Sequence, residues 1–107
     1  MKIECKVDEK NRQRDYHLDG ELDVHQAKLL KERLVEDLEE IQEGSWVIRL
    51  HMENVQYLDS SGLGMLVYLK KEIKLRHGKL HIDGLKDAVY NVFKLTRLDE
   101  FFELPKP

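Results

Sequence analysis

Apolar and polar positions alternate along the first part of the chain. Every second residue is apolar within residues 2–7, and Tyr16 and Leu18 resume this alternation after a polar break at residues 8–12. Side chains of a strand point alternately to its two faces, so the pattern is typical of strands with one buried face. The two segments are close in sequence and joined by polar residues. We therefore expect an antiparallel hairpin at one edge of a sheet.

The following segment has the period of a helix. Apolar residues recur at steps of three and four over residues 24–41, which places them on one face of an amphipathic helix. Asp23 directly precedes this segment, and Gln26 follows Asp23 by three residues, as in a capping box. Asp23 is therefore expected to cap the start of the helix. Gly44 is expected to end it.

Residues 46–50 (WVIRL) form a nearly continuous apolar run, which is typical of a central strand that is covered on both faces. A second helix is predicted to open at Ser60 and to be buried through Leu69, because this half is apolar almost all round. Gly78 is expected to break that helix. Shorter apolar patterns predict a strand over residues 80–82, a third helix over residues 85–93 and a last strand over residues 101–104.

Strands and helices thus alternate after one opening hairpin. This order predicts a single α/β domain over residues 1–107, a sandwich with a mixed sheet of about four or five strands and three main helices. The net charge of −3 disfavours direct nucleic-acid binding, which needs a basic surface. We expect no signal peptide and no membrane span, so the sequence favours a cytoplasmic protein without a membrane partner.

Residues 59–64 (DSSGLG) lie between the predicted central strand and the second helix. A helix N-terminus presents unpaired N–H groups and the positive end of the helix dipole, so a phosphate on Ser60 or Ser61 would meet donors that already point toward it. Serine is also a favourable N-cap, so the segment could simply start a helix. Gly62 is expected to let the backbone approach a partner or a phosphate, and Gly64 to let the helix pack against the sheet.

Other chemistry finds less support in these residues. Neither serine lies in a G-x-S-x-G elbow, which argues against a hydrolase. Residues 62–64 lack the third glycine of a dinucleotide loop and the lysine of a P-loop. No pair of the five histidines has a helical ligand spacing, since the Gly78 turn separates His77 from His81. We therefore expect surface histidines, no metal site and no cofactor.

Four segments that span nearly the whole chain carry a family resemblance. Two are specific, namely residues 19–23 (DGELD) before the first helix and residues 55–64 (VQYLDSSGLG) before the second. Two are weaker, namely residues 78–80 (GKL) and residues 95–102 (LTRLDEFF). Together they resemble the anti-sigma factor antagonists, small bacterial proteins built on a STAS domain. The resemblance implies a STAS-like sandwich that catalyses no reaction itself.

In that family the first hydroxyl residue after the aspartate is the phosphoacceptor, which the resemblance places at Ser60, with Ser61 as the second choice. The unphosphorylated form binds an anti-sigma factor with serine kinase activity and so frees the sigma factor. Phosphorylation ends this binding, and a serine phosphatase restores it. The resemblance also implies a partner-binding surface, made of Asp23, Asp59, Ser60, Ser61, Gly62, Leu63 and Gly64.

Two features depart from the family. Arg97 stands where a glycine is usual after the third helix, so either a left-handed residue there costs about 1 kcal/mol or the turn is built differently. The chain also ends at residue 107, without room for the terminal helix that many members carry. Two other functions remain open. One is a scaffold or interaction module of another signalling complex, and the other is a small-ligand or nucleotide-binding domain.

Overall fold

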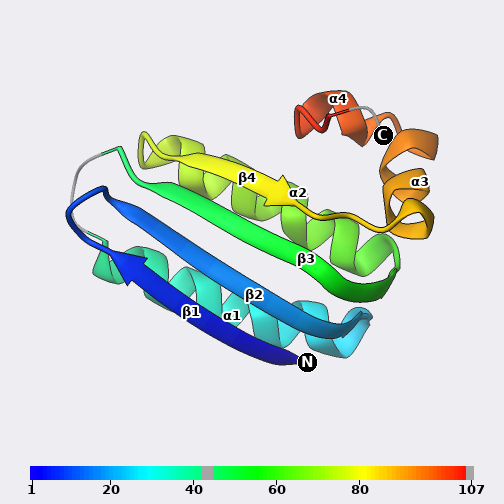
Figure 1. The fold of residues 1–107 in the computed structure, drawn as a ribbon, viewed down its shortest axis with the longest axis horizontal. Helices are drawn as coiled ribbons and strands as arrows, with labels where there is room; N and C mark the ends of the chain where they lie inside the picture. The colour runs from blue at the N-terminus through cyan, green and yellow to red at the C-terminus, as the bar shows by residue number, and fades with distance from the viewer. Residues whose placement is uncertain (42–44, 106–107) are drawn as a thin grey trace.

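The computed structural model describes residues 1–41 and 45–105, and in these residues four strands form one mixed sheet in the order β1-β2-β3-β4 (Figure 1). β1 (Lys2–Asp8) pairs antiparallel with β2 (Gln13–Leu22). β3 (Val47–Leu58) is parallel to β2 on one side and to β4 (Lys79–Asp83) on the other. The predicted hairpin, the mixed sheet and the interior position of the third strand are confirmed.

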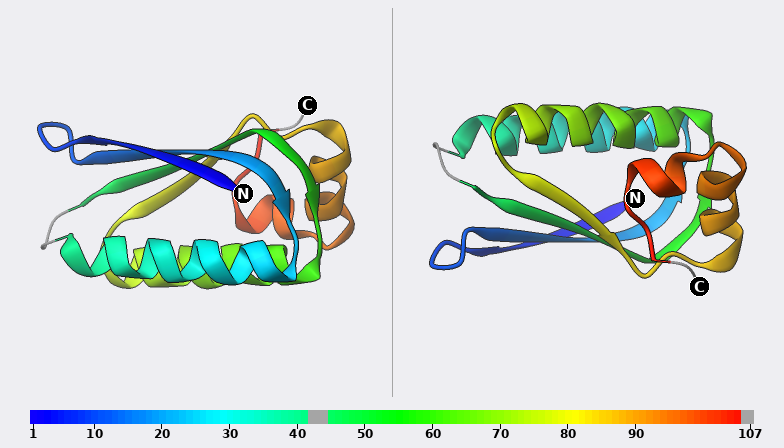
Figure 2. Two further views of the ribbon diagram at one scale, coloured as in Figure 1. Left: turned by 90° about the horizontal axis from the view of Figure 1, so that it is seen from below. Right: turned by 90° about the horizontal axis from the view of Figure 1, so that it is seen from above.

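The two long helices, α1 (Val24–Glu40) and α2 (Ser60–Leu75), lie side by side against one face of the sheet (Figure 2). The shorter helices α3 (Asp87–Leu95) and α4 (Leu98–Phe101) lie at one end of the sandwich, next to the end of β4. The three predicted helices are therefore confirmed. Among the described residues, no helix has the length and apolar character that crossing a bilayer requires.

The hydrophobic core lies between the sheet and the helices. Along β3 the buried residues Ile48, Leu50 and Met52 alternate with Arg49 and His51, which are only partly buried. Strand side chains alternate between faces, so the first group packs on the helices and the second lies on the open face. The prediction of a strand covered on both faces is wrong, because no described helix lies over that second face (Figure 2).

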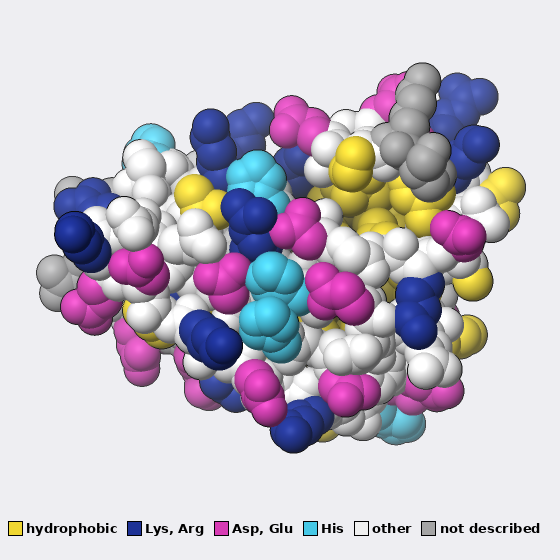
Figure 3. All heavy atoms as spheres, viewed as in Figure 1, with side chains coloured by type: hydrophobic (Ala, Val, Ile, Leu, Met, Phe, Trp, Pro, Cys, Tyr) yellow, Lys and Arg dark blue, Asp and Glu magenta, His cyan; other side chains and the backbone are white. Residues whose placement is uncertain are grey.

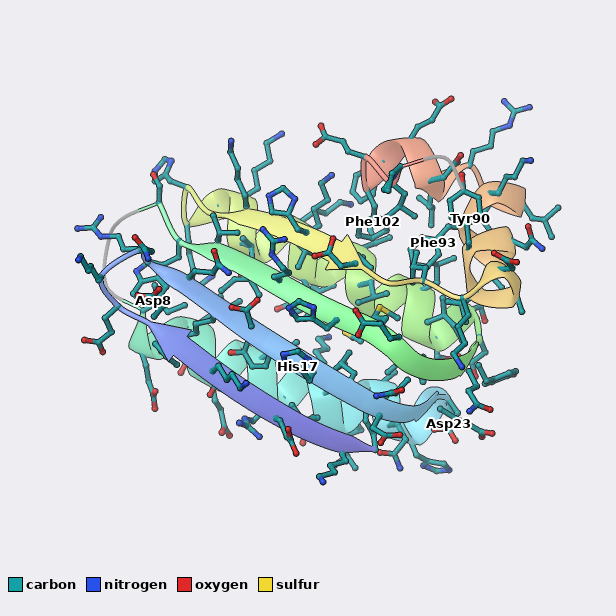
Figure 4. All side chains as sticks on the ribbon, in the orientation of Figure 1. Asp8, His17, Asp23, Tyr90, Phe93 and Phe102 are labelled. Atoms are coloured by element: carbon teal, nitrogen blue, oxygen red, sulfur yellow. The ribbon has the colours of Figure 1, made fainter. Side chains whose placement is uncertain are left out.

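The predicted last strand over residues 101–104 is also wrong, because Phe101 is the last residue of α4 and the residues after it form a turn. Phe102 is buried, and its ring packs edge-on against Phe93 at 5.4 Å between ring centroids (Figure 4). Lys70 from α2 donates a hydrogen bond to the carbonyl of Phe101. Contacts with α2 and α3 thus hold the end of α4 and the turn after it in place. A brief apolar run is compatible with either type of element.

The ends of the helices differ from the sequence expectation in detail. α1 ends at Glu40, and Gly44, its predicted end, lies outside the described residues. α2 ends at Leu75, and His77 rather than Gly78 adopts the left-handed conformation that follows it, with φ 61°. Arg97, between α3 and α4, has φ 60° and ψ 21°. The left-handed conformation considered for Arg97 is therefore confirmed.

Candidate functional site

The starts of α1 and α2 lie next to each other because β2 and β3 are parallel. Leu22 pairs with Leu58 at the carboxyl ends of the two strands, and each strand leads directly into a helix. The Asp59 N–H group donates to the Leu22 carbonyl at 3.5 Å, which links the two strand ends. Asp23 and Asp59, the N-cap residues of the two helices, consequently share one edge of the sheet. In parallel sheets this edge commonly carries the functional site.

Asp23 caps α1 as predicted, since its Oδ1 accepts a hydrogen bond from the Gln26 N–H group at 2.9 Å. The second half of the predicted capping box is replaced by another contact. Gln26 Oε1 accepts from the amino group of Met1 at 2.9 Å, which joins the start of β1 to the start of α1. The Gln26 side chain therefore holds the start of the edge strand against the helix.

Asp59 caps α2 in the same way, and this changes the expected role of the helix start. Asp59 Oδ1 accepts from the N–H groups of Ser61 and Gly62, both at 3.0 Å, and the Asp59 carbonyl accepts from Leu63 N–H at 3.0 Å. The expectation that these donors await a phosphate is wrong for this conformation, because they are already bonded. A phosphate on the exposed Ser60 would instead add charge beside the Asp59 carboxylate.

The two glycines of this segment have roles opposite to those expected. A Cβ atom on Gly62 would lie 2.6 Å from the Leu22 carbonyl oxygen and 2.7 Å from Leu58 Cδ1, so this glycine allows α2 to pack against the sheet. A Cβ atom on Gly64 would meet nothing within 4 Å. Gly64 is exposed, so its lack of a side chain leaves the helix surface open at this position.

A shallow groove runs between the first turns of α1 and α2. Its lining includes Val24, Lys28 and Lys31 from α1, and Ser61, Gly64 and Tyr68 from α2. The Lys31 ammonium lies 4.1 Å from the centroid of the Tyr68 ring, which holds the two helices' side chains together over the groove.

Of the predicted site residues, Ser60, Ser61 and Gly64 are exposed, and Asp23 and Asp59 are partly buried. Gly62 and Leu63 are buried beneath this surface. Val24 directly follows Asp23 and is 56% exposed, and Tyr57 precedes Asp59 by two residues and is 49% exposed; no sequence pattern selected either residue.

The structure also joins two residues that no local pattern connects. His17 of β2 pairs with His51 of β3 in the parallel register, on the open face of the sheet. Their rings are stacked, with 4.2 Å between ring centroids and an angle of 6° between the ring planes. Helical spacing could not reveal this pair, because strand register brings it together. The group lies on the opposite face of the sheet from α1 and α2.

Comparison with known proteins agrees with this architecture. The STAS domain family model matches residues 4–106. The chain belongs to the STAS domain family. It is 31% identical over 105 residues to the anti-sigma-B factor antagonist of Listeria monocytogenes, an alignment that covers 97% of this chain and 90% of the relative. The family resemblance predicted from the four sequence segments is confirmed.

Solved structures of SpoIIAA, an anti-sigma factor antagonist, have the same fold as this STAS domain. The unphosphorylated form superposes with a TM-score of 0.68 at 18% identity, covering 88% of this chain and 83% of SpoIIAA. The phosphorylated form gives a TM-score of 0.69 at 19% identity, covering 92% and 86%. The predicted STAS-like α/β sandwich is therefore confirmed.

Proposed function

We propose that this STAS domain is a phosphorylatable anti-sigma factor antagonist. Its unphosphorylated form binds an anti-sigma factor with serine kinase activity, which releases the sigma factor. Phosphorylation of Ser60 ends the binding, and a serine phosphatase restores it. The protein itself catalyses no reaction in this scheme. A relative that is 31% identical over 97% of this chain and is named an anti-sigma-B factor antagonist supports the proposal.

The observation that carries the proposal is the exposed Ser60 in the first turn of α2, directly after the Asp59 cap. A phosphoserine carries about 1.5 to 2 negative charges at neutral pH. The neighbouring Ser61 and Gly62 N–H groups are bonded to Asp59, so they do not neutralise this charge. The phosphate therefore adds repulsion and bulk to the surface on which the partner docks.

The docking surface consists of the two helix starts and the groove between them. Val24 and Tyr57 supply exposed apolar area, and Asp23 lies at the start of α1. A partner shaped for the neutral Ser60 hydroxyl would lose contact with this surface once the phosphate is present. A coupling free energy of about 1–3 kcal/mol, or roughly a 5- to 150-fold loss of affinity, is sufficient for such a switch.

The phosphoacceptor is tested by incubating the protein with its cognate kinase and ATP and mapping the phosphate by mass spectrometry. Ser60→Ala should abolish incorporation, whereas the matched variant Ser61→Ala should at most reduce it. Ser61 is the alternative acceptor because it lines the groove beside Lys28 and Lys31, where a phosphate would find positive charge. Phosphate that persists in Ser60→Ala and maps to Ser61 would reassign the site.

A scaffold module of another signalling complex is the alternative function. Such a module would use the same exposed groove without phosphorylation. Replacement of Ser60 by Asp would then leave partner affinity unchanged, since the hydroxyl would have no regulatory part. Nucleotide binding would be recognised by heat release when ATP or GTP is titrated into the protein alone.

A further inference from the structure

The open face of the sheet carries a cluster of histidine and acidic side chains. Strand alternation places Asp15 and His17 of β2 on this face together with His51 and Glu53 of β3. Histidine side chains gather at the middle of the face, with acidic and basic side chains around them (Figure 3). His17 lies near the centre of β2, away from the helix starts (Figure 4). The proposed partner switch makes no use of this cluster.

Three of these residues offer ligand atoms to a common point. One ligand atom each from His17, His51 and Glu53 lies within 4.8 Å of the other two. His51 Nδ1 and Glu53 Oε1 are 3.7 Å apart. In a tetrahedral zinc site with bonds of 2.0–2.1 Å, two ligand atoms are separated by about 3.3 Å. The three atoms are therefore near enough for side-chain rotations to bring them to binding distance.

Asp15 sets which nitrogen of His51 is free to bind. Asp15 Oδ1 lies 2.8 Å from His51 Nε2, and Asp15 Oδ2 accepts from Gln13 Nε2 at 3.0 Å. His51 thus has its Nε2 atom turned toward Asp15 and its Nδ1 atom turned toward Glu53. A histidine that donates one N–H to a carboxylate is the usual arrangement of a metal ligand.

We propose that His17, His51 and Glu53 bind one divalent transition-metal ion of the zinc type on the open face of the sheet. Two imidazoles and one carboxylate suit zinc, nickel or copper better than magnesium or calcium, which prefer oxygen ligands alone. Water would complete the coordination. Arg49, the nearby cation on β3, is paired with Asp83 at 3.0 Å, so its charge is already balanced.

Closing the site requires movement that the surface permits. The Glu53 side chain is 53% exposed, and His17 is only partly buried. Binding would replace the parallel stack of the two rings, because a metal bonded to both nitrogens must lie near both ring planes.

Titration of Zn²⁺ into the untagged full chain, followed by calorimetry, tests this site. We expect one ion per chain, and His17→Gln and His51→Gln should each weaken binding at least tenfold, since even the loss of an outer-shell partner typically costs about 10–100-fold. His81→Gln is the matched control, because His81 lies on the same face in β4 but outside the cluster. This control should bind Zn²⁺ as tightly as the unmodified protein does.

Glu53→Gln gives a second variant, at a side chain that is 53% exposed, and it should also weaken Zn²⁺ binding. Long-range ¹H–¹⁵N spectra should show the Nδ1 signal of His51 shifting with Zn²⁺ while Nε2 remains protonated. Absence of Zn²⁺ binding to the unmodified protein would overturn the proposal. Binding that is equal in His51→Gln and His81→Gln would overturn it as well.

Discussion

The roles of Gly62 and Gly64 can be separated by one pair of substitutions. Alanine at Gly62 would place a methyl group 2.6 Å from the Leu22 carbonyl oxygen, where the closest real Cβ contacts exceed 3.0 Å. The contacted atom belongs to the backbone at the end of β2, so it cannot rotate aside. The start of α2 would have to move away from the sheet, together with the Asp59 cap. Alanine at Gly64 would meet nothing.

The expected sizes follow from two opposing terms. Overpacking typically costs about 1–3 kcal/mol, and replacing a helical glycine by alanine returns about 0.5–1 kcal/mol. Because the clash is with backbone, we expect Gly62→Ala to lose about 2 kcal/mol of unfolding free energy. Gly64→Ala should gain about 0.5–1 kcal/mol. For a domain of this size, each kcal/mol corresponds to a shift in Tm of roughly 4–8 °C.

Thermal and urea denaturation followed by circular dichroism measure both values under the same conditions. Gly62→Ala should melt roughly 8–16 °C below the unmodified protein, and Gly64→Ala a few degrees above it. The opposite sign for the matched variant controls for the general effect of alanine on a helix. Equal stability of Gly62→Ala and the unmodified protein would refute the close approach of α2 to β2.

Three further results are expected. Arg97→Gly should stabilise the fold by up to about 1 kcal/mol in urea denaturation, because Arg97 is left-handed at φ 60°. Loss of a positive charge near the end of α3 opposes this gain by roughly 0.3–1 kcal/mol, and a clear destabilisation would show that the Arg97 side chain makes a needed contact. Tyr16→Phe should lower the free energy of unfolding by about 1.5 kcal/mol, because the buried Tyr16 hydroxyl donates a hydrogen bond to Asp37 Oδ2 at 2.8 Å. This value is the low end for a hydrogen bond to a charged acceptor, since Arg33 still pairs with that oxygen in the variant, and unchanged stability in urea would contradict the prediction. Ser60→Asp should weaken partner binding only partially in calorimetry, since it adds one negative charge rather than a full phosphate, and unchanged affinity would count against the switch.

Local patterns were enough to predict most of the fold. The alternation around Tyr16 identified the hairpin, and Asp23 and Ser60 were placed correctly at the starts of their helices. The failures lie where an element depends on distant contacts. The chain leaves α4 at Phe101 as a turn and not as a strand, where Phe102 packs on Phe93 and Lys70 reaches the Phe101 carbonyl, and a short apolar run carries no sign of such contacts.

Long-range register limited the prediction of the sites in the same way. The sequence placed Asp59, Ser60 and Ser61 at the start of a helix, because helix-start chemistry is local. It exchanged the roles of Gly62 and Gly64, since these roles depend on which of the two glycines lies against Leu22. His17 and His51 could not be paired from spacing, because only the parallel register of β2 and β3 places them opposite each other.

Partner affinity before and after phosphorylation tests the proposed switch most directly. The protein is phosphorylated stoichiometrically by its cognate kinase, the phosphate is located by mass spectrometry, and both forms are titrated with the anti-sigma factor in a calorimeter. We expect phosphate on Ser60 and a loss of affinity of roughly 5- to 150-fold or more. Equal affinity of the two forms, with Ser60 fully phosphorylated, would contradict the account.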